Sequence, residues 1–294
     1  MSSKAPPGHL GPYRLLSVVH ASKTARLWHA YHGGLDRFFA VKALQDKSCK
    51  DREEIGYLKR EYEVGAKLDH PRAIRIQEFG TDQGIPYLAM EWFAAPNMKL
   101  RIQQGVDGIA PLIAKIILQA TEGLAYFNNQ GWVHRDIKPE NFLVNDEGDV
   151  KLIDYALAQR QKKGLARLFT PKSKVQGTHS YMSPEQIRGA ALDDRADLYS
   201  LACTFYELAT GKPPFTGASA NELLTKHLKA NPVPLEKVNT NVTPEFGELI
   251  RRAMAKEPSD RQGSVQEFLH CLQAIRVFRR APPAPQTDGK TTTP

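Results

Sequence analysis

Residues 133–156 constrain the fold of this chain more than any other stretch. Two short apolar runs, residues 142–144 and 150–153, flank the sequence NDEG, which has the composition of a hairpin turn. Pairing of the two runs would bring Asp154 back beside Asp136 and Asn141. Two carboxylates held close together destabilise each other, and a divalent cation or a substrate proton would relieve that repulsion. The stretch therefore predicts a functional site at the base of a hairpin.

The same stretch carries a family resemblance. The sequence HRDIKPEN, residues 134–141, resembles the catalytic loop of the eukaryotic-like serine/threonine protein kinases, and DYA, residues 154–156, stands where that family has Asp-Phe-Gly. The sequence SPE, residues 183–185, matches the end of the family's activation segment. The resemblance extends over about residues 13–275. It implies an α+β fold of two lobes, with an antiparallel sheet and one helix in the small lobe and a mostly α-helical large lobe.

The resemblance also implies a reaction, the transfer of the γ-phosphoryl group of ATP to a serine or threonine hydroxyl. In that reaction Asp136 would orient the hydroxyl and accept its proton, and Lys138 would neutralise charge on the transferred group. Asn141 and Asp154 would hold Mg²⁺, or alternatively Mn²⁺, through hard oxygen ligands. Ala156 departs from the family pattern, because a glycine there has conformational freedom that alanine lacks.

A second departure lies between two expected strands, residues 13–19 and 25–31. In the family this turn is a glycine-rich loop whose N–H groups cover the ATP phosphates, and its glycine positions correspond here to His20, Ser22 and Ala25. Side chains at these positions are expected to hinder close approach of the backbone and the unusual φ values that glycine allows.

Residues 38–42, FFAVK, are expected to form a third strand that ends in Lys42. A lysine at the end of a strand is usually only solvated, but the resemblance makes Lys42 the ligand of the α- and β-phosphates. A helix over about residues 51–68 would supply its carboxylate partner. Glu61 lies beside the apolar stripe of that helix, whereas Glu63 points about 200° away around it. Glu61 is therefore the predicted partner.

The expected strands at 73–79 and 87–91 lead to the sequence MEWF, residues 90–93, which resembles the linker between kinase lobes. Met90 would lie at the back of the adenine pocket, and main-chain groups near Glu91 and Phe93 would bind the adenine edge. The remaining nucleotide contacts implied by the resemblance are Val19, Leu27, Ala40 and Leu143.

Apolar spacing predicts helices at 110–129, 193–208, 219–229, 244–255 and 264–278. Consecutive prolines at 213–214 are expected to end the second of these. Asp197 is expected to cap the backbone of the catalytic loop, and Thr178 to brace Asp136 and Lys138. The resemblance pairs Arg261 with Glu185 as a structural contact.

Residues 157–182 contain no acid and account for most of the net charge of +8. This basic segment has three readings: a solvated loop, a dock for an acidic partner, or a loop ordered when Thr170 or Ser173 is phosphorylated and pairs with Arg135. Nucleic-acid binding is not favoured, because no aromatic interleaving or fold motif accompanies the charge. The cations of the segment are Arg160, Lys162, Lys163, Arg167, Lys172 and Lys174.

Apolar residues make up 41% of the chain, enough for one sizeable core or two packed lobes. No uninterrupted apolar run reaches the ~18 residues of a membrane span. The first twelve residues lack the apolar core of a signal peptide. The three cysteines are widely spaced, which suggests reduced thiols. We therefore expect a cytoplasmic protein with no membrane partner, and the family resemblance implies a protein substrate. The expected organisation is a flexible lead at 1–12, a kinase domain at 13–278 with its small lobe at about 13–91 and its large lobe at about 94–278, and a disordered tail at 279–294. The alternative is a pseudokinase scaffold with weak or no turnover, which the missing glycines and Ala156 favour.

Overall fold

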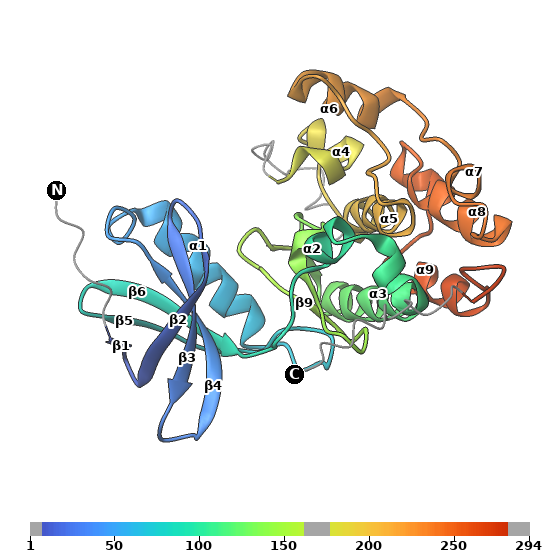
Figure 1. The fold of residues 1–294 in the computed structure, drawn as a ribbon. Helices are drawn as coiled ribbons and strands as arrows, with labels where there is room; N and C mark the ends of the chain where they lie inside the picture. Colours follow the sequence, from blue (N-terminus) through green and yellow to red (C-terminus); the bar gives the residue numbers. More distant parts are fainter. Residues whose placement is uncertain (1–7, 162–176, 282–294) are drawn as a thin grey trace, which may run out of the picture.

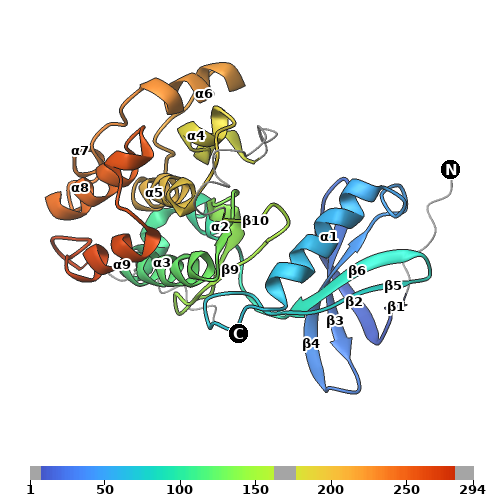
Figure 2. The ribbon, with the colours of Figure 1, turned by 180° about the vertical axis from the view of Figure 1, so that it is seen from behind.

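The computed structural model describes residues 8–161 and 177–281 and arranges them in two lobes (Figure 1, with the opposite side in Figure 2). A six-stranded antiparallel sheet and helix α1 (Arg52–Gly65) form the small lobe. The large lobe is built mostly from helices (Figure 1). The predicted two-lobed α+β class is confirmed.

Strands β1 to β4 follow one another through short turns, helix α1 lies in the long connection from β4 to β5, and β6 lies between β4 and β5 in the sheet. β5 begins at Ile76, three residues later than predicted, because the preceding residues pair elsewhere. Ala73 forms a bridge with Leu152 of the large lobe, and the Ile74 N–H donates to the Leu152 carbonyl at 2.9 Å. The strands are β1 (His9–Leu10), β2 (Tyr13–Ala21), β3 (Ala25–His32), β4 (Arg37–Leu44), β5 (Ile76–Asp82) and β6 (Ile85–Glu91).

The predicted lead at 1–12 is too long. His9 and Leu10 pair with the start of β2, and Leu10 is 1% exposed in the outer core of the small lobe. The predicted start of the tail at residue 279 is also too early. The Arg279 N–H donates to the Asn241 carbonyl at 2.7 Å. Burial of one apolar side chain and a few backbone hydrogen bonds thus extend the fold at both ends. Residues 1–7 and 282–294 lie outside the described residues.

Helix α1 covers one face of the sheet (Figure 2). The Asp51 side chain caps it by accepting from the Glu53 N–H. At its last residue, Gly65, a Cβ would lie 2.2 Å from Ile76 Cγ1 and 2.9 Å from Tyr155 Cδ2. Only glycine fits there, so the end of α1 approaches both the sheet and the segment that follows the hairpin.

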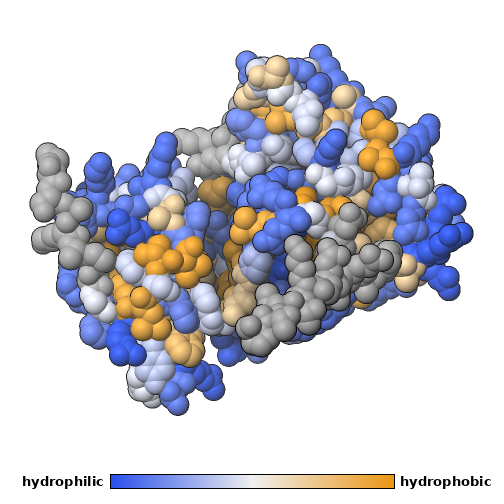
Figure 3. Space-filling model, in the orientation of Figure 1, coloured by the Kyte–Doolittle hydropathy of each residue, from blue (hydrophilic) through white to orange (hydrophobic). Residues whose placement is uncertain are grey.

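Two apolar clusters lie on the two faces of the sheet. The cluster that contains Ala40 and Met90 continues into the large lobe, whereas Phe39 and Val41 belong to a separate outer cluster. Figure 3 shows apolar surface on the small lobe. The large apolar side chains exposed on β2 and β4 are Leu16, Val18, Val19 and Phe38.

The hairpin predicted from residues 133–156 is confirmed, because β8 (Phe142–Val144) pairs with β9 (Val150–Leu152). β7 (Trp132–Val133) and β10 (Gln159–Arg160) form a second short pair beside it. The remaining large-lobe elements are α2 (Met98–Gln103), η1 (Val106–Leu112), α3 (Ile113–Asn129), η2 (Pro139–Asn141), η4 (His179–Tyr181), α4 (Pro184–Ile187), α5 (Asp194–Thr210), α6 (Ala220–Lys229), α7 (Leu235–Val238), α8 (Pro244–Ala253), η5 (Pro258–Asp260) and α9 (Val265–Gln273).

Helix ends differ from the predictions in two informative places. The helix expected from residue 110 begins as α3 at Ile113, because the preceding 3-10 turn contains Pro111. Helix α5 ends at Thr210 and is capped by Gly211, whose φ of 76° lies in the left-handed region, so it ends before the prolines that follow.

Among the described residues one helical stretch, Gly108–Asn129, is long and apolar enough by composition to cross a membrane. Its most apolar window is 56% buried. This stretch contributes Ile116, Leu124 and Phe127 to the core, each fully buried. The apolar character of the stretch is therefore explained by its place in the core of the large lobe.

Candidate active site

The buried Asp197 of α5 holds the predicted catalytic loop, residues 134–141, through hydrogen bonds to its backbone. Its carboxylate accepts the backbone N–H groups of His134 at 2.7 Å and Arg135 at 2.8 Å, and the side-chain amide of Asn128 at 2.9 Å. Burial raises the pKa of Asp197, and these donors oppose the rise. The predicted cap is confirmed. Arg135 has a φ of 71°, a conformation that a non-glycine residue holds only when its surroundings impose it.

Four predicted side chains converge in this loop. Lys138 Nζ lies 2.6 Å from Asp136 Oδ2 and 2.8 Å from Thr178 Oγ1, and the Thr178 N–H donates to Asp136 Oδ1 at 3.1 Å. The Asn141 side-chain amide donates to the Asp136 carbonyl at 2.7 Å. The predicted bracing role of Thr178 is confirmed, and the Asp136 carboxylate is fixed from two sides.

Lys42 reaches the same region from β4. Its Nζ lies 2.8 Å from Glu61 Oε2 and 3.9 Å from Asp154 Oδ1. Burial alone would lower the pKa of Lys42, but the two carboxylates outweigh it and raise that pKa. Burial raises the pKa of Glu61 in spite of its cationic partner. Asp154 behaves in the opposite way, because Lys42 and other nearby cations lower its pKa against the effect of burial.

The choice between the two glutamates of α1 is settled by this geometry. The side chain of Glu61 is 3% exposed and contacts Lys42. The side chain of Glu63 is 64% exposed and pairs only loosely with Arg60, at 3.8 Å. Glu61 is the partner, as predicted.

The segment after the hairpin turns sharply at Asp154, whose φ is 65°. Tyr155 is fully buried, stacks on Phe127 with ring centroids 5.5 Å apart, and donates its hydroxyl to the Leu152 carbonyl at 2.9 Å. Ala156 does not have a positive φ. The freedom that glycine would give is therefore not needed at Ala156 in this conformation, and the strained position is Asp154 itself.

The donor set suits a hard divalent cation. Asn141 supplies an amide oxygen and Asp154 a carboxylate, and such cations are commonly held by a few protein oxygens together with phosphates and water. Within residues 8–161 and 177–281, no three His, Cys, Asp or Glu side chains group as a metal site on their own. The two residues fit a metal that is completed by a nucleotide.

The predicted nucleotide-binding residues lie along the inner face of the sheet. On neighbouring strands, Leu27 lies opposite Lys42 and Ala40 lies opposite Met90. The side chains of Ala40 and Met90 are both buried. From the large lobe, Leu143 bridges to Asn97, next to α2. Val19 is 48% exposed at the end of β2. Sheet and hairpin thus present apolar side chains near the lobe junction.

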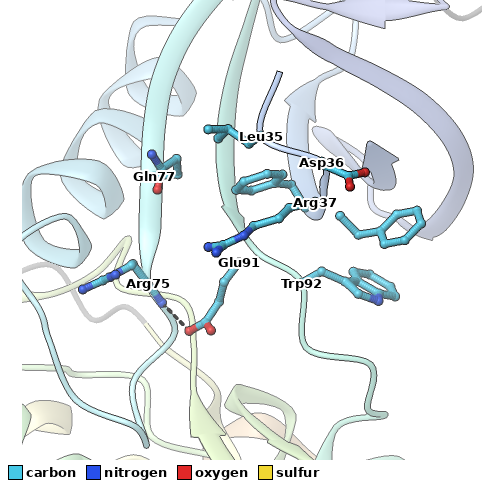
Figure 4. Close-up of a pocket in the computed structure, with 9 residues that line it drawn as sticks. Leu35, Asp36, Arg37, Arg75, Gln77, Glu91 and Trp92 are labelled. Carbon is cyan, nitrogen blue, oxygen red and sulfur yellow. Dashed lines mark hydrogen bonds between the residues drawn. The ribbon is translucent and has the colours of Figure 1, made fainter. Parts of the chain in front are cut away.

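The side chain of Glu91 lies on the outer side of the sheet, opposite to the inner face that carries Ala40 and Met90. Its Oε1 accepts the Arg75 N–H at 2.8 Å (Figure 4) and lies 2.7 Å from Lys151 Nζ. A groove of about 760 Å³ opens on this outer side, where Arg37, Arg75 and Trp92 form part of its wall. The side chain of Glu91 is therefore engaged on this outer side, away from the predicted adenine pocket. The Phe93 carbonyl accepts the Ala95 N–H at 2.8 Å.

Two contacts near the site carried no sequence signal. Lys151 of β9 joins the hairpin to the end of β6 through Glu91, although sixty positions separate the two residues. Lys99 of α2 pairs with the buried Glu207 of α5, and its Nζ lies 3.3 Å from the Tyr181 hydroxyl. Both are contacts between distant segments, which local patterns do not predict.

Glu185 and Arg261 form the predicted structural pair, with nitrogen–oxygen distances of 2.7 and 2.8 Å. Most of the basic segment lies outside the described residues, and so do the hydroxyls of Thr170 and Ser173.

Comparison with known proteins identifies the family. Residues 22–272 match the family described as "Protein kinase domain". The chain belongs to the protein kinase family. The serine/threonine-protein kinase PknB of Mycolicibacterium smegmatis is 35% identical over 94% of this chain and 44% of its own length. PknL of Mycobacterium tuberculosis, also named a serine/threonine-protein kinase, is 31% identical over 95% of this chain and 70% of its own length.

The chain spans less than half the length of the PknB relative that it matches. Among solved structures, the kinase domain of Mycobacterium tuberculosis PknI aligns with a TM-score of 0.67 over 93% of this chain and 99% of that chain, at 23% identity. This likeness supports the kinase fold.

Proposed function

We propose that this chain is an ATP-dependent serine/threonine protein kinase domain, which transfers the γ-phosphoryl group of ATP to a protein hydroxyl. The observation that carries the proposal is the convergence of Lys42, Glu61 and Asp154 with the Asp136–Lys138–Asn141 loop at the junction of the lobes. The names of the relatives agree with it. In this proposal the catalytic unit extends beyond the predicted residues 13–278, from β1 at one end to Arg279 at the other.

In this proposal the nucleotide lies between the lobes. Lys42, fixed by Glu61, binds the α- and β-phosphates as a compact point charge. Main-chain groups of Glu91 and Phe93 bind the adenine edge, with Met90 behind it. The apolar walls are formed by Val19, Leu27, Ala40 and Leu143.

Asp136 orients the acceptor hydroxyl and takes its proton. Its carboxylate is suited to this because Lys138 and Thr178 fix both of its oxygens. Lys138 Nζ also neutralises charge on the transferred group. Such a reaction needs little covalent chemistry from the protein, so positioning and charge supply most of the catalysis.

Kinases of this family use ATP with a divalent metal, and Asn141 and Asp154 are the residues that would hold it. When bound, the metal neutralises charge on the phosphates. We propose Mg²⁺ as this metal, with Mn²⁺ as the alternative, because carboxylate, amide and phosphate oxygens are hard ligands that suit both.

We also propose that the protein substrate carries an acidic patch, which docks on the basic segment. The support is the absence of any acid between residues 157 and 182. A cytoplasmic location without a membrane partner completes the proposal. It agrees with the free thiols of Cys49, Cys203 and Cys271.

The test is incubation of the purified protein with ATP and either Mg²⁺ or Mn²⁺, followed by mass spectrometry of the protein and of a generic protein substrate. The expected result is phosphate on serine and threonine, with faster incorporation in Mg²⁺. Phosphate on tyrosine alone, or none above a sample without metal, would contradict the proposal.

A further inference from the structure

The turn between β2 and β3 is closed by its own side chain. Ser22 Oγ accepts the backbone N–H groups of Ala25 at 3.0 Å and Thr24 at 3.3 Å, and donates to the Ala25 carbonyl at 3.1 Å. The Ser22 N–H also donates to the Ala25 carbonyl, at 2.9 Å. A hydroxyl has one donor and two acceptor sites. Ser22 uses all three within the turn.

A second residue ties this turn to the end of β4. Gln45 Nε2 donates to the Ser22 carbonyl at 2.5 Å, and the Gln45 N–H donates to the Thr24 carbonyl at 2.8 Å. Gln45 is itself held, because its carbonyl accepts the Ser48 N–H at 2.7 Å. The turn is therefore clamped from outside as well as capped from within.

The backbone of the turn does not use conformations that require glycine. No residue from 20 to 25 has a positive φ. Ala25 is 8% exposed and lies in the main apolar cluster, opposite Leu44. The turn thus has none of the unusual φ values that glycine allows, as expected for residues that carry side chains. Their effect is on hydrogen bonding and packing.

The position of the turn gives these contacts a consequence for nucleotide binding. Leu27 lies opposite Lys42, and the turn ends just before Ala25, which is two residues before Leu27 in the chain. In the proposed function Lys42 binds phosphates, and the N–H groups of Thr24 and Ala25 are two of the donors that the neighbouring turn carries. Both N–H groups are already taken by Ser22 Oγ.

We propose that Ser22 is a positioning residue that withholds these two N–H groups from the nucleotide phosphates and thereby sets a reduced affinity for them. A phosphate that binds the turn must first displace the serine hydroxyl. This inference rests on the proposed function, because it concerns the same nucleotide site. It predicts that phosphate binding depends mainly on Lys42 and the metal.

The test compares the binding of ADP and adenosine, with Mg²⁺, to the wild-type chain and to Ser22→Ala by calorimetry. ADP carries phosphates but no transferable γ-phosphoryl group, and adenosine carries neither. Ser22→Ala should bind ADP about three- to tenfold more tightly, as expected for one or two recovered charge-assisted hydrogen bonds. Its affinity for adenosine should stay within about twofold.

Two further variants isolate the hydroxyl. Ser22→Thr keeps it and should retain the wild-type affinity for ADP. Ser17→Ala removes an exposed hydroxyl from β2 outside the turn and should change neither affinity. Hydrogen exchange provides an independent readout, since the Thr24 and Ala25 amides should lose protection in Ser22→Ala without ligand.

Unchanged or weaker ADP binding by Ser22→Ala would overturn the inference, and so would an equal gain for ADP and adenosine. The proposed function fails in a different way. If Lys42→Met, which removes the ammonium but keeps the volume, binds ADP as tightly as the wild type, the nucleotide site itself is wrongly placed.

Discussion

Arg261 should be among the most sensitive positions for stability in the large lobe. Its side chain is fully buried, and its five N–H groups donate to Glu185 and to the carbonyls of Ala255, Arg195 and Lys256. Arg261→Leu would leave the nearly buried Glu185 carboxylate without its cation and three carbonyls without a donor. Breaking a buried ion pair on one side costs about 3–5 kcal/mol. We expect a loss of that size in the free energy of unfolding.

Urea unfolding followed by fluorescence measures this loss. Arg251→Ala is the control, because Arg251 is 66% exposed and its surface pair with Glu248 should contribute less than about 1 kcal/mol. The double variant Arg261→Leu, Glu185→Leu should be more stable than Arg261→Leu alone, because it removes the uncompensated charge. If Arg261→Leu loses less than about 1 kcal/mol, or if the double variant is the less stable of the two, the reasoning is refuted.

Three further predictions concern other buried charges. Lys256 lies over the ring of Phe215 and, within the described part of the chain, its Nζ has no hydrogen-bond partner. Burial lowers its pKa from 10.5 to about 8, so the unfolded chain binds more protons between these values and stability should rise with pH across them. In urea titrations Lys256→Met should flatten this rise and stabilise the protein at pH 7 by about 1–2 kcal/mol; an unchanged profile would contradict this. In a phosphate-transfer assay Glu61→Gln should lower kcat/KM for ATP about a hundredfold, because Lys42 loses its position, whereas Glu63→Gln should stay within about twofold; equal effects would contradict the assignment. Asp197→Asn should lower the free energy of unfolding by about 1–3 kcal/mol, since an amide cannot accept all three donors; a neutral result would show that the cap is dispensable.

Much of the site was predictable because it depends on short motifs with local geometry. The apolar runs at 142–144 and 150–153 fixed the hairpin, and the helical position of Glu61 against Glu63 decided the partner of Lys42. The roles of Asp197 and Arg261 came from the family resemblance. All of these contacts are present.

The missed features depend on contacts that no local pattern encodes. The sequence suggested that the loss of glycine at Ser22 and Ala25 would only hinder the turn, whereas the hydroxyl caps it and the methyl group fills the core. The first strand was hidden in a proline-rich stretch, and the burial of Leu10 together with backbone pairing to β2 explains its formation. The end of helix α5 is a local exception, because the left-handed Gly211 caps the helix after Thr210, before the prolines can end it.

In the proposed function Asp136 acts on the acceptor hydroxyl within an otherwise intact nucleotide site. Single-turnover phosphate transfer by the wild-type chain and by Asp136→Asn, measured beside their affinities for ADP, isolates this role. The rate should be at least about a hundredfold lower for Asp136→Asn, with ADP affinity within about threefold. Equal rates for the two proteins would show that Asp136 takes no part in the transfer.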